Sequence, residues 1–222
     1  MNNISGTIRW GIIGCGDVCE VKSGPAFNKV ADSKLVAVMR RDLDKAKDFA
    51  QRHGVPKYYG DAAALINDPE INAIYIATPP SSHELYLEMA LKAGKPVYVE
   101  KPVTVNSASV QRMMEMEKNH DGKVSVAHYR RGMPLFNKIK QLVNDGTIGK
   151  VKLILLKTLQ PPVSNIIIQT DDNWRIDPEI SGAVYFMIFL HISWILCIGY
   201  LELHKKHMYS PLTRGKYTMH PI

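Results

Sequence analysis

The feature that most constrains the fold is a pair of glycines directly after a short apolar segment. Residues 8–13 are mostly apolar and predict a buried strand, and Gly14 and Gly16 follow it. Gly14 permits a sharp turn, and Gly16 removes the Cβ where a pyrophosphate must approach backbone N–H groups at a helix N-terminus. The third position of this dinucleotide-binding fingerprint is Cys19, which is small but is not the usual glycine or alanine. An ordinary glycine turn is the alternative to a cofactor-binding backbone formed by Gly14, Gly16, Asp17 and Val18.

The segments after the glycines predict a parallel α/β sheet. Residues 34–39 are apolar almost throughout and predict a second buried strand, and residues 42–53 predict a helix that Asp42 caps and Gly54 ends. The first strand, a helix and the second strand fit the length that a βαβ unit requires. The remaining pattern predicts helices over 18–28, 61–66, 82–93, 107–119 and 134–144, and strands over 73–77, 97–99, 123–128 and 151–159.

The end of the second predicted strand decides which dinucleotide fits. An acidic residue there would hydrogen-bond the ribose 2′-hydroxyl of NAD, whereas an arginine accommodates the 2′-phosphate of NADP. The strand ends in Arg40 and Arg41, and the first acid, Asp42, caps the next helix. We therefore expect NADP, with Arg40 as the phosphate ligand and Arg41 stacking on adenine or adding charge. Two solvated arginines beside a helix cap, with NAD as the cofactor, are the alternative.

Two further strand ends carry polar residues at the sheet edge where open α/β folds bind ligands. The predicted strand over 73–77 leads into two prolines that rigidify the loop, and the strand over 97–99 leads into a lysine followed by a proline. The side chains expected at the cofactor edge from these loops are Thr78, Pro79, His83, Glu100 and Lys101.

The order of these motifs resembles the Gfo/Idh/MocA family of NAD(P)-dependent oxidoreductases. The matching steps are the glycine turn, the Ala-Thr-Pro step at 77–79 with His83, and the run over 93–102 that contains Glu-Lys-Pro. The resemblance extends over residues 7–182. It implies a Rossmann domain with a doubly wound parallel sheet over 1–128. Residues 129–182 would begin an α/β domain of the dihydrodipicolinate-reductase type, which carries the substrate face and the subunit interface.

The resemblance also implies roles for single residues. Lys101 would lie beside the nicotinamide and the substrate hydroxyl, as a proton relay or an orienting group. A surface lysine paired with Glu100 is the alternative. Taken without the family, the Trp-Arg pair at 174–175 offers a planar surface for a sugar or polyol, or is a packed cation–π pair. The substrate contacts that the resemblance implies are Tyr129, Arg131, Trp174 and Arg175.

The family pattern breaks after Gly182, where glycines, an aspartate and a histidine are expected. Residues 183–201 instead contain no Asp, Glu, Lys or Arg and are long enough to cross a membrane. When the codons are taken from their third base, residues 187–188 and 194–195 both require GAT, the codon for aspartate, and the family spacing returns. We therefore expect 183–222 to be an out-of-frame tail, with a membrane anchor as the alternative.

Charge, cysteine content and the N-terminal sequence bear on partners, metal sites and compartment. The 222-residue chain has a formal net charge of +7, but its lysines and arginines never form a run longer than two, so we expect no nucleic-acid partner. Its three cysteines, Cys15, Cys19 and Cys197, lack metal-binding spacing, which predicts a reducing compartment without disulfides and no metal site. The N-terminal residues do not read as a secretory signal, so a cytoplasmic protein without a membrane partner is expected.

The resemblance to the family implies an NAD(P)-dependent dehydrogenase. Its reaction would transfer a hydride between nicotinamide and a sugar, a polyol or a related secondary alcohol, and we expect it to be impaired in this chain. A homo-oligomer is expected for full-length family members but not for a chain without the second-domain sheet. A non-catalytic NADP-binding sensor or scaffold is the alternative function, and a dinucleotide-binding protein anchored through 183–201 is the third.

Overall fold

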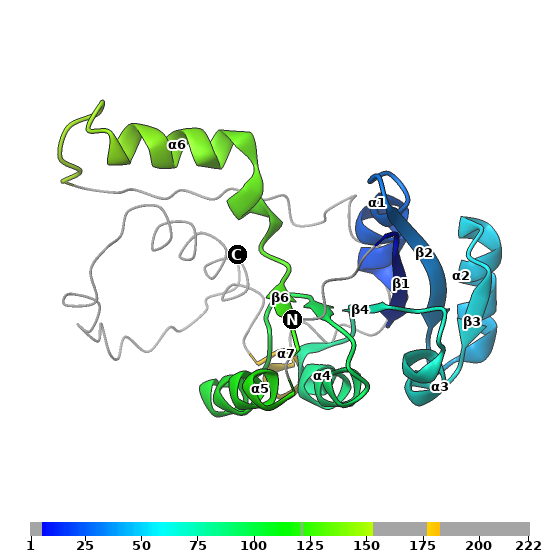
Figure 1. Cartoon of the computed structure of the whole chain (residues 1–222). Helices are drawn as coiled ribbons and strands as arrows, with labels where there is room; N and C mark the ends of the chain where they lie inside the picture. The colour runs from blue at the N-terminus through cyan, green and yellow to red at the C-terminus, as the bar shows by residue number, and fades with distance from the viewer. Residues whose placement is uncertain (1–5, 121, 153–176, 183–222) are drawn as a thin grey trace, which may run out of the picture. The chain divides into compact units, whose positions relative to one another are not determined.

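The computed structural model describes residues 6–120, 122–152 and 177–182 (Figure 1). These residues belong to two compact units, and each unit is described by itself. The first contains residues 6–120, 122–128 and 177–182, and the second contains residues 129–152. The strand predicted over 151–159, the Trp-Arg pair at 174–175 and the tail over 183–222 lie outside the described residues, the first of them almost entirely.

A six-stranded parallel sheet forms the centre of the first unit, in the order β3-β2-β1-β4-β5-β6. The chain runs outward from β1 to β3, returns to the other side of β1 with β4, and continues to β6 (Figure 1). This doubly wound order places the topological switch point between β1 and β4, where ligands bind in such folds. The strands are β1 (Ile8–Ile13), β2 (Ser33–Met39), β3 (Lys57–Tyr59), β4 (Ala73–Ile76), β5 (Val97–Val99) and β6 (Val124–Val126).

Helices connect the strands, and side-chain caps fix where three of them begin. The side chains of Asp42, Asp61 and Asn106 accept backbone N–H groups at the starts of α2, α3 and α5, as expected for N-caps. The helical segments of the first unit are η1 (Cys19–Ser23), α1 (Gly24–Phe27), α2 (Leu43–His53), α3 (Ala62–Asn67), η2 (Pro80–Ser82), α4 (His83–Lys92), α5 (Ser107–Asn119) and α7 (Pro178–Ser181).

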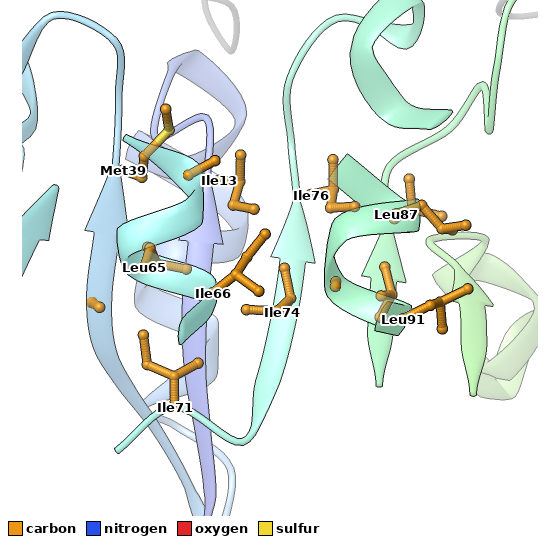
Figure 2. Close-up of a cluster of buried hydrophobic side chains, with 14 of the residues drawn as sticks. Ile13, Met39, Leu65, Ile66, Ile71, Ile74, Ile76, Leu87 and Leu91 are labelled. Carbon is orange, nitrogen blue, oxygen red and sulfur yellow. The ribbon is translucent and has the colours of Figure 1, made fainter. Parts of the chain in front are cut away.

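Two separate hydrophobic cores cover the two faces of the sheet. Strand side chains alternate between the faces, so Ile74 and Ile76 enter one core and Tyr75 enters the other. The first core receives side chains from α3, α4 and α5, and Figure 2 shows Leu65, Leu87 and their neighbours lying over the strands. The second core lies under η1, α1 and α2. The end of β1 that leads into the glycine turn is therefore buried on both faces of the sheet, through Ile12 on one face and Ile13 on the other.

Several predicted elements have different bounds in the structure. The strand β3 was not predicted, because its three residues form a strand only by pairing with β2. The helix predicted over 18–28 is a π-helical turn followed by the short α1, and a Cβ on Gly24 would lie 2.4 Å from the Cys19 carbonyl oxygen. The strand predicted over 123–128 is shorter, as β6.

The segment 177–182 groups with the first unit in the structure. A Cβ on Gly182 would lie 2.5 Å from the Val105 Cα atom, so glycine allows this segment to pack against the loop after β5. Its short helix α7 contacts η2.

The second unit contains η3 (Tyr129–Gly132) and α6 (Pro134–Asn144). Pro134 occupies the first turn of α6, where a missing N–H costs no hydrogen bond. Leu135 and Ile139 are exposed on this helix. In the described part of the chain, no helix is both long and apolar enough to span a membrane.

Candidate dinucleotide-binding site

The glycine turn after β1 is tied to the strands on both sides. The N–H groups of Gly14 and Cys15 donate to the Met39 carbonyl oxygen, over 2.9 and 3.2 Å. Gly14 has φ +91°, and a Cβ there would lie 2.7 Å from Thr78 Cγ2 and 2.9 Å from Thr78 N. Only glycine meets both conditions without strain. The predicted sharp turn is confirmed, and it lies between the ends of β2 and β4.

The first turn of the following helix presents free backbone donors. The N–H of Gly16 donates to the Gly14 carbonyl oxygen over 2.8 Å, and the N–H of Cys19 donates to the Gly16 carbonyl oxygen over 2.8 Å. Within the described residues, the N–H groups of Asp17 and Val18 have no acceptor. A Cβ on Gly16 would meet nothing within 4 Å, so it would project into open space beside these donors. Free N–H groups next to open space fit a pyrophosphate.

The third fingerprint position packs as a small apolar residue. Cys19 is fully buried, and its thiol donates weakly to the Gly14 carbonyl oxygen over 3.6 Å. Burial raises the pKa of Cys15 to about 11 and that of Cys19 to about 12. Both thiols are therefore neutral at physiological pH and unsuited to nucleophilic or metal-binding chemistry. No cluster of metal-binding side chains is present among the described residues.

The arginines after β2 form no salt bridge among the described residues, although the charge of Arg40 contributes to lowering the Asp42 pKa. The backbone N–H of Arg40 pairs with the Tyr59 carbonyl oxygen over 3.1 Å, and Arg41 is exposed. Neither guanidinium forms an ion pair or a hydrogen bond with the described residues. The Asp42 carboxylate accepts the N–H of Lys45 over 3.1 Å, and this bond lowers its pKa. The only acid at this strand end therefore caps a helix, as predicted.

The loop after β4 is organised by two side chains. The Ser82 hydroxyl donates to Thr78 Oγ1 and lies 2.9 Å from it. The imidazole of His83 lies with Nε2 2.7 Å from the Thr78 carbonyl oxygen and Nδ1 3.1 Å from that of Val103. Burial lowers its pKa, and only 1% of the residue is exposed. His83 therefore joins the Thr78 loop to the loop after β5, and its predicted role as a cofactor contact stays a prediction.

The loop after β5 is built around the Glu100 carboxylate. Its Oε1 accepts the Tyr75 hydroxyl over 2.7 Å, and its Oε2 accepts the backbone N–H of Lys101 over 3.2 Å. The N–H of Glu100 donates to the Ile76 carbonyl oxygen over 2.9 Å, which joins this loop to β4. Lys101 is half-buried and precedes a cis peptide bond to Pro102.

The structure brings most of the predicted residues to one edge of the sheet. Gly14 touches the start of the Thr78 loop, and the Thr78 and Lys101 loops are joined through His83. The predicted substrate residues are not part of this edge as described. Tyr129 and Arg131 are exposed on η3 in the second unit, and Trp174 and Arg175 lie outside the described residues. Tyr75 was not predicted, although strand alternation places it on the same face as Glu100.

The sequence of the described sheet matches a known family. The sequence model of the Gfo/Idh/MocA oxidoreductases, described as an oxidoreductase family with an NAD-binding Rossmann fold, matches residues 8–128. The chain belongs to the Gfo/Idh/MocA oxidoreductase family. The predicted family and the predicted Rossmann fold with a doubly wound parallel sheet are therefore confirmed.

Individual members of the family are similar to longer parts of the chain. An oxidoreductase from Formosa agariphila is 52% identical over 179 residues, which is 81% of this chain and 56% of that protein. The chain spans about half the length of the curated relatives that it matches.

Two solved structures of the family carry different nicotinamide cofactors. A point mutant of a 3-ketoreductase from Actinomadura kijaniata, in complex with TDP-benzene and NADP, is 27% identical with a TM-score of 0.61, over 65% of this chain and 44% of that one. A scyllo-inositol dehydrogenase from Lactobacillus casei, with NAD(H) and scyllo-inositol, is 27% identical with a TM-score of 0.60, over 64% of this chain and 42% of that one. Family membership thus indicates a nicotinamide dinucleotide but does not choose between NAD and NADP.

Proposed function

We propose that the chain is the cofactor-binding part of an NADP-dependent oxidoreductase that acts on a sugar, a polyol or a related secondary alcohol. The observation that carries the choice of NADP is the pair of arginines after β2, Arg40 and Arg41, whose guanidinium groups form no salt bridge or hydrogen bond with the residues that the structure describes. An arginine at this strand end accommodates a 2′-phosphate, whereas an acid there would hydrogen-bond the ribose 2′-hydroxyl of NAD. The names of the inositol dehydrogenase and the ketoreductase support the substrate class.

The residues that would hold NADP lie on three loops. The free N–H groups of Asp17 and Val18 would bind the pyrophosphate, because the missing Cβ of Gly16 leaves room for it. Arg40 would bind the 2′-phosphate, and Arg41 would stack on the adenine or add charge. Thr78 and Pro79 would border the nicotinamide half, with Ser82 orienting the Thr78 hydroxyl. NADP, when bound, supplies or accepts the hydride.

Lys101 would handle the proton that accompanies the hydride. In the oxidation direction, the substrate hydroxyl gives its proton to the neutral amine while the adjacent carbon loses a hydride. The positive charge of an oxidised nicotinamide ring next to a lysine disfavours the protonated amine, so it would favour the neutral amine that this step needs. Tyr129, Arg131, Trp174 and Arg175 remain predictions as substrate contacts. The second domain over 129–182 and the out-of-frame tail over 183–222 also remain predictions.

Titration of the purified chain with NADPH and NADH, followed by nicotinamide fluorescence, tests the cofactor assignment. One charge-assisted contact is worth about 1.5–3 kcal/mol, so we expect NADPH to bind about ten- to a hundredfold more tightly. Equal affinities would contradict the choice of NADP, and binding of neither would contradict the proposal.

Turnover separates the enzyme from the alternative of a non-catalytic sensor or scaffold. A chain with the family reading frame restored after Gly182 should oxidise members of a panel of sugars and polyols with NADP. The 222-residue chain with its out-of-frame tail should show little turnover. If the chain with the restored frame binds NADPH tightly but turns over none of a broad panel of sugars and polyols, the sensor is favoured.

A further inference from the structure

A buried tyrosine links the interior of the sheet to the loop that carries Lys101. Tyr75 lies in β4 with none of its surface exposed. Its ring centroid lies 5.2 Å from that of Phe27 and 5.5 Å from that of Tyr98, in the core under η1, α1 and α2. A phenylalanine would fill this space equally well. The hydroxyl is therefore the part of the side chain that packing does not explain.

The hydroxyl has one carboxylate partner, and sheet geometry explains why. Tyr75 is the register partner of Tyr98 on β5, and Glu100 follows Tyr98 by two residues on the same face. The Tyr75 hydroxyl donates to Glu100 Oε1 over 2.7 Å. A buried hydroxyl is costly unless it is hydrogen-bonded, so this bond fixes where the carboxylate lies. Burial, followed by the nearby carboxylate, raises the Tyr75 pKa, so the phenol keeps its proton and remains the donor.

The other carboxylate oxygen carries the constraint to the lysine. Glu100 Oε2 accepts the backbone N–H of Lys101 over 3.2 Å, at the point where the chain leaves β5. We infer that Tyr75 is a positioning residue, which holds the Glu100 carboxylate and through it the backbone that aims Lys101. The inference rests on the proposed function in assigning Lys101 to the reaction. The hydrogen bonds from Tyr75 to Glu100 and from Lys101 to Glu100 do not depend on that assignment.

The same fold contains a matched control for the loss of one hydroxyl. Tyr59 donates to Asp68 Oδ2 over 2.7 Å, and Asp68 Oδ1 accepts the backbone N–H of Glu70 over 2.9 Å. Each tyrosine thus holds a carboxylate whose second oxygen holds a backbone N–H. Only the Tyr75 arrangement ends at Lys101. Tyr75→Phe and Tyr59→Phe therefore remove the same kind of bond at two places.

Amide hydrogen exchange in the full chain without cofactor measures the positioning directly. We expect Tyr75→Phe to speed exchange of the Lys101 N–H by about tenfold, because its acceptor is no longer held. Tyr59→Phe should leave Lys101 unchanged and speed exchange of the Glu70 N–H instead. Unchanged Lys101 exchange in Tyr75→Phe, or an equal change in both variants, would overturn the inference.

The pH profile of Lys101 acetylation, followed by mass spectrometry, separates positioning from general stability. A released Glu100 carboxylate stabilises a protonated amine, so Tyr75→Phe should move the profile of Lys101 to higher pH while Tyr59→Phe leaves it in place. A profile that stays in place in Tyr75→Phe would show that the bond serves stability alone and would overturn the inference. Titration with NADPH is read separately. If the wild-type chain binds no nicotinamide cofactor, the proposed function fails, and the exchange and acetylation results still decide the role of Tyr75.

Discussion

Arg40 and Arg52 lie in the same unit, but they differ in how the chain uses them. Arg52 at the end of α2 donates to both carboxylate oxygens of Glu20, each over 2.7 Å, and to Asp48 over 2.7 Å. Arg40 at the end of β2 has no such partner among the described residues. The bonds of Arg52 join η1 to α2 and hold the fold. A guanidinium that forms no salt bridge with the described part of the chain is instead available to a ligand, and this difference supports the assignment of Arg40 to the 2′-phosphate.

The largest predicted effect is a loss of turnover, and it separates a lysine at the ligand-binding edge, Lys101, from a lysine of the scaffold, Lys57. In the chain with the reading frame restored after Gly182, Lys101→Ala should lower turnover by about 10²–10⁴-fold, because it removes the proton-handling group. Lys57 instead lies 2.8 Å from Asp68 and 2.9 Å from Glu70, in ion pairs of the scaffold. Lys57→Ala should therefore lower the melting temperature and leave turnover per folded molecule unchanged. Steady-state rates and thermal unfolding of both variants check this, and full turnover by Lys101→Ala would remove the lysine from the mechanism.

The two glycines of the turn should separate stability from binding. Gly14→Ala combines a positive φ with contacts below 3 Å to Thr78, and should lower the free energy of unfolding by about 2–4 kcal/mol. Gly16→Ala meets open space, so it should leave the free energy of unfolding nearly unchanged and weaken NADPH binding. Urea unfolding and NADPH titration of the two variants make the comparison. A stable Gly14→Ala protein, or a Gly16→Ala protein with wild-type affinity, would show that the turn has been assigned wrongly.

The scaffold arginine predicts a smaller effect that depends on pH. The hydrogen bond from Arg52 is the main cause that lowers the Glu20 pKa to about 2. Burial of the carboxylate opposes this shift, and the contact with His53 adds to it. Because the folded-state pKa is lower than the unfolded one, this stabilisation is present above about pH 4.5 and is lost as the pH falls toward 2. Glu20→Gln should lower the free energy of unfolding at pH 7 by about 1 kcal/mol and by less at pH 3. Urea unfolding at the two pH values checks this, and an equal loss at both would contradict it.

Local signals in the sequence were sufficient for much of the fold. The predicted bounds of β1, β5, α5 and α6 agree with the structure, because apolar blocks, helix caps and prolines mark them within a few residues. β3 was missed because pairing with β2 creates it, and the π-helical turn η1 was missed because its geometry is set by packing around Gly24. The pairing of β3 with β2 and the packing of Gly24 against Phe49 of α2 both join segments that are not adjacent in the sequence.

The site was predictable at its glycines and arginines but not in its supporting bonds. The turn at Gly14 and the end of β2 at Arg40 follow from the order of strand, glycine and strand. His83 was expected at the cofactor edge because it follows the Thr-Pro step at the end of a predicted strand, as in the family pattern. Its burial depends on the Thr78 and Val103 carbonyl groups, which the fold brings to opposite sides of the ring. The bond between Tyr75 and Glu100 likewise joins two strands and has no local signal.

The ratio of NADPH to NADH affinity in Arg40→Ala and Arg52→Ala tests the central claim most directly. We expect Arg40→Ala to lose most of the preference for NADPH and to keep its melting temperature, because only the 2′-phosphate contact is removed. Arg52→Ala should keep the preference and unfold at a lower temperature, because Glu20 and Asp48 lose their partner. An unchanged ratio in Arg40→Ala would contradict the claim that this unpartnered arginine binds the cofactor phosphate.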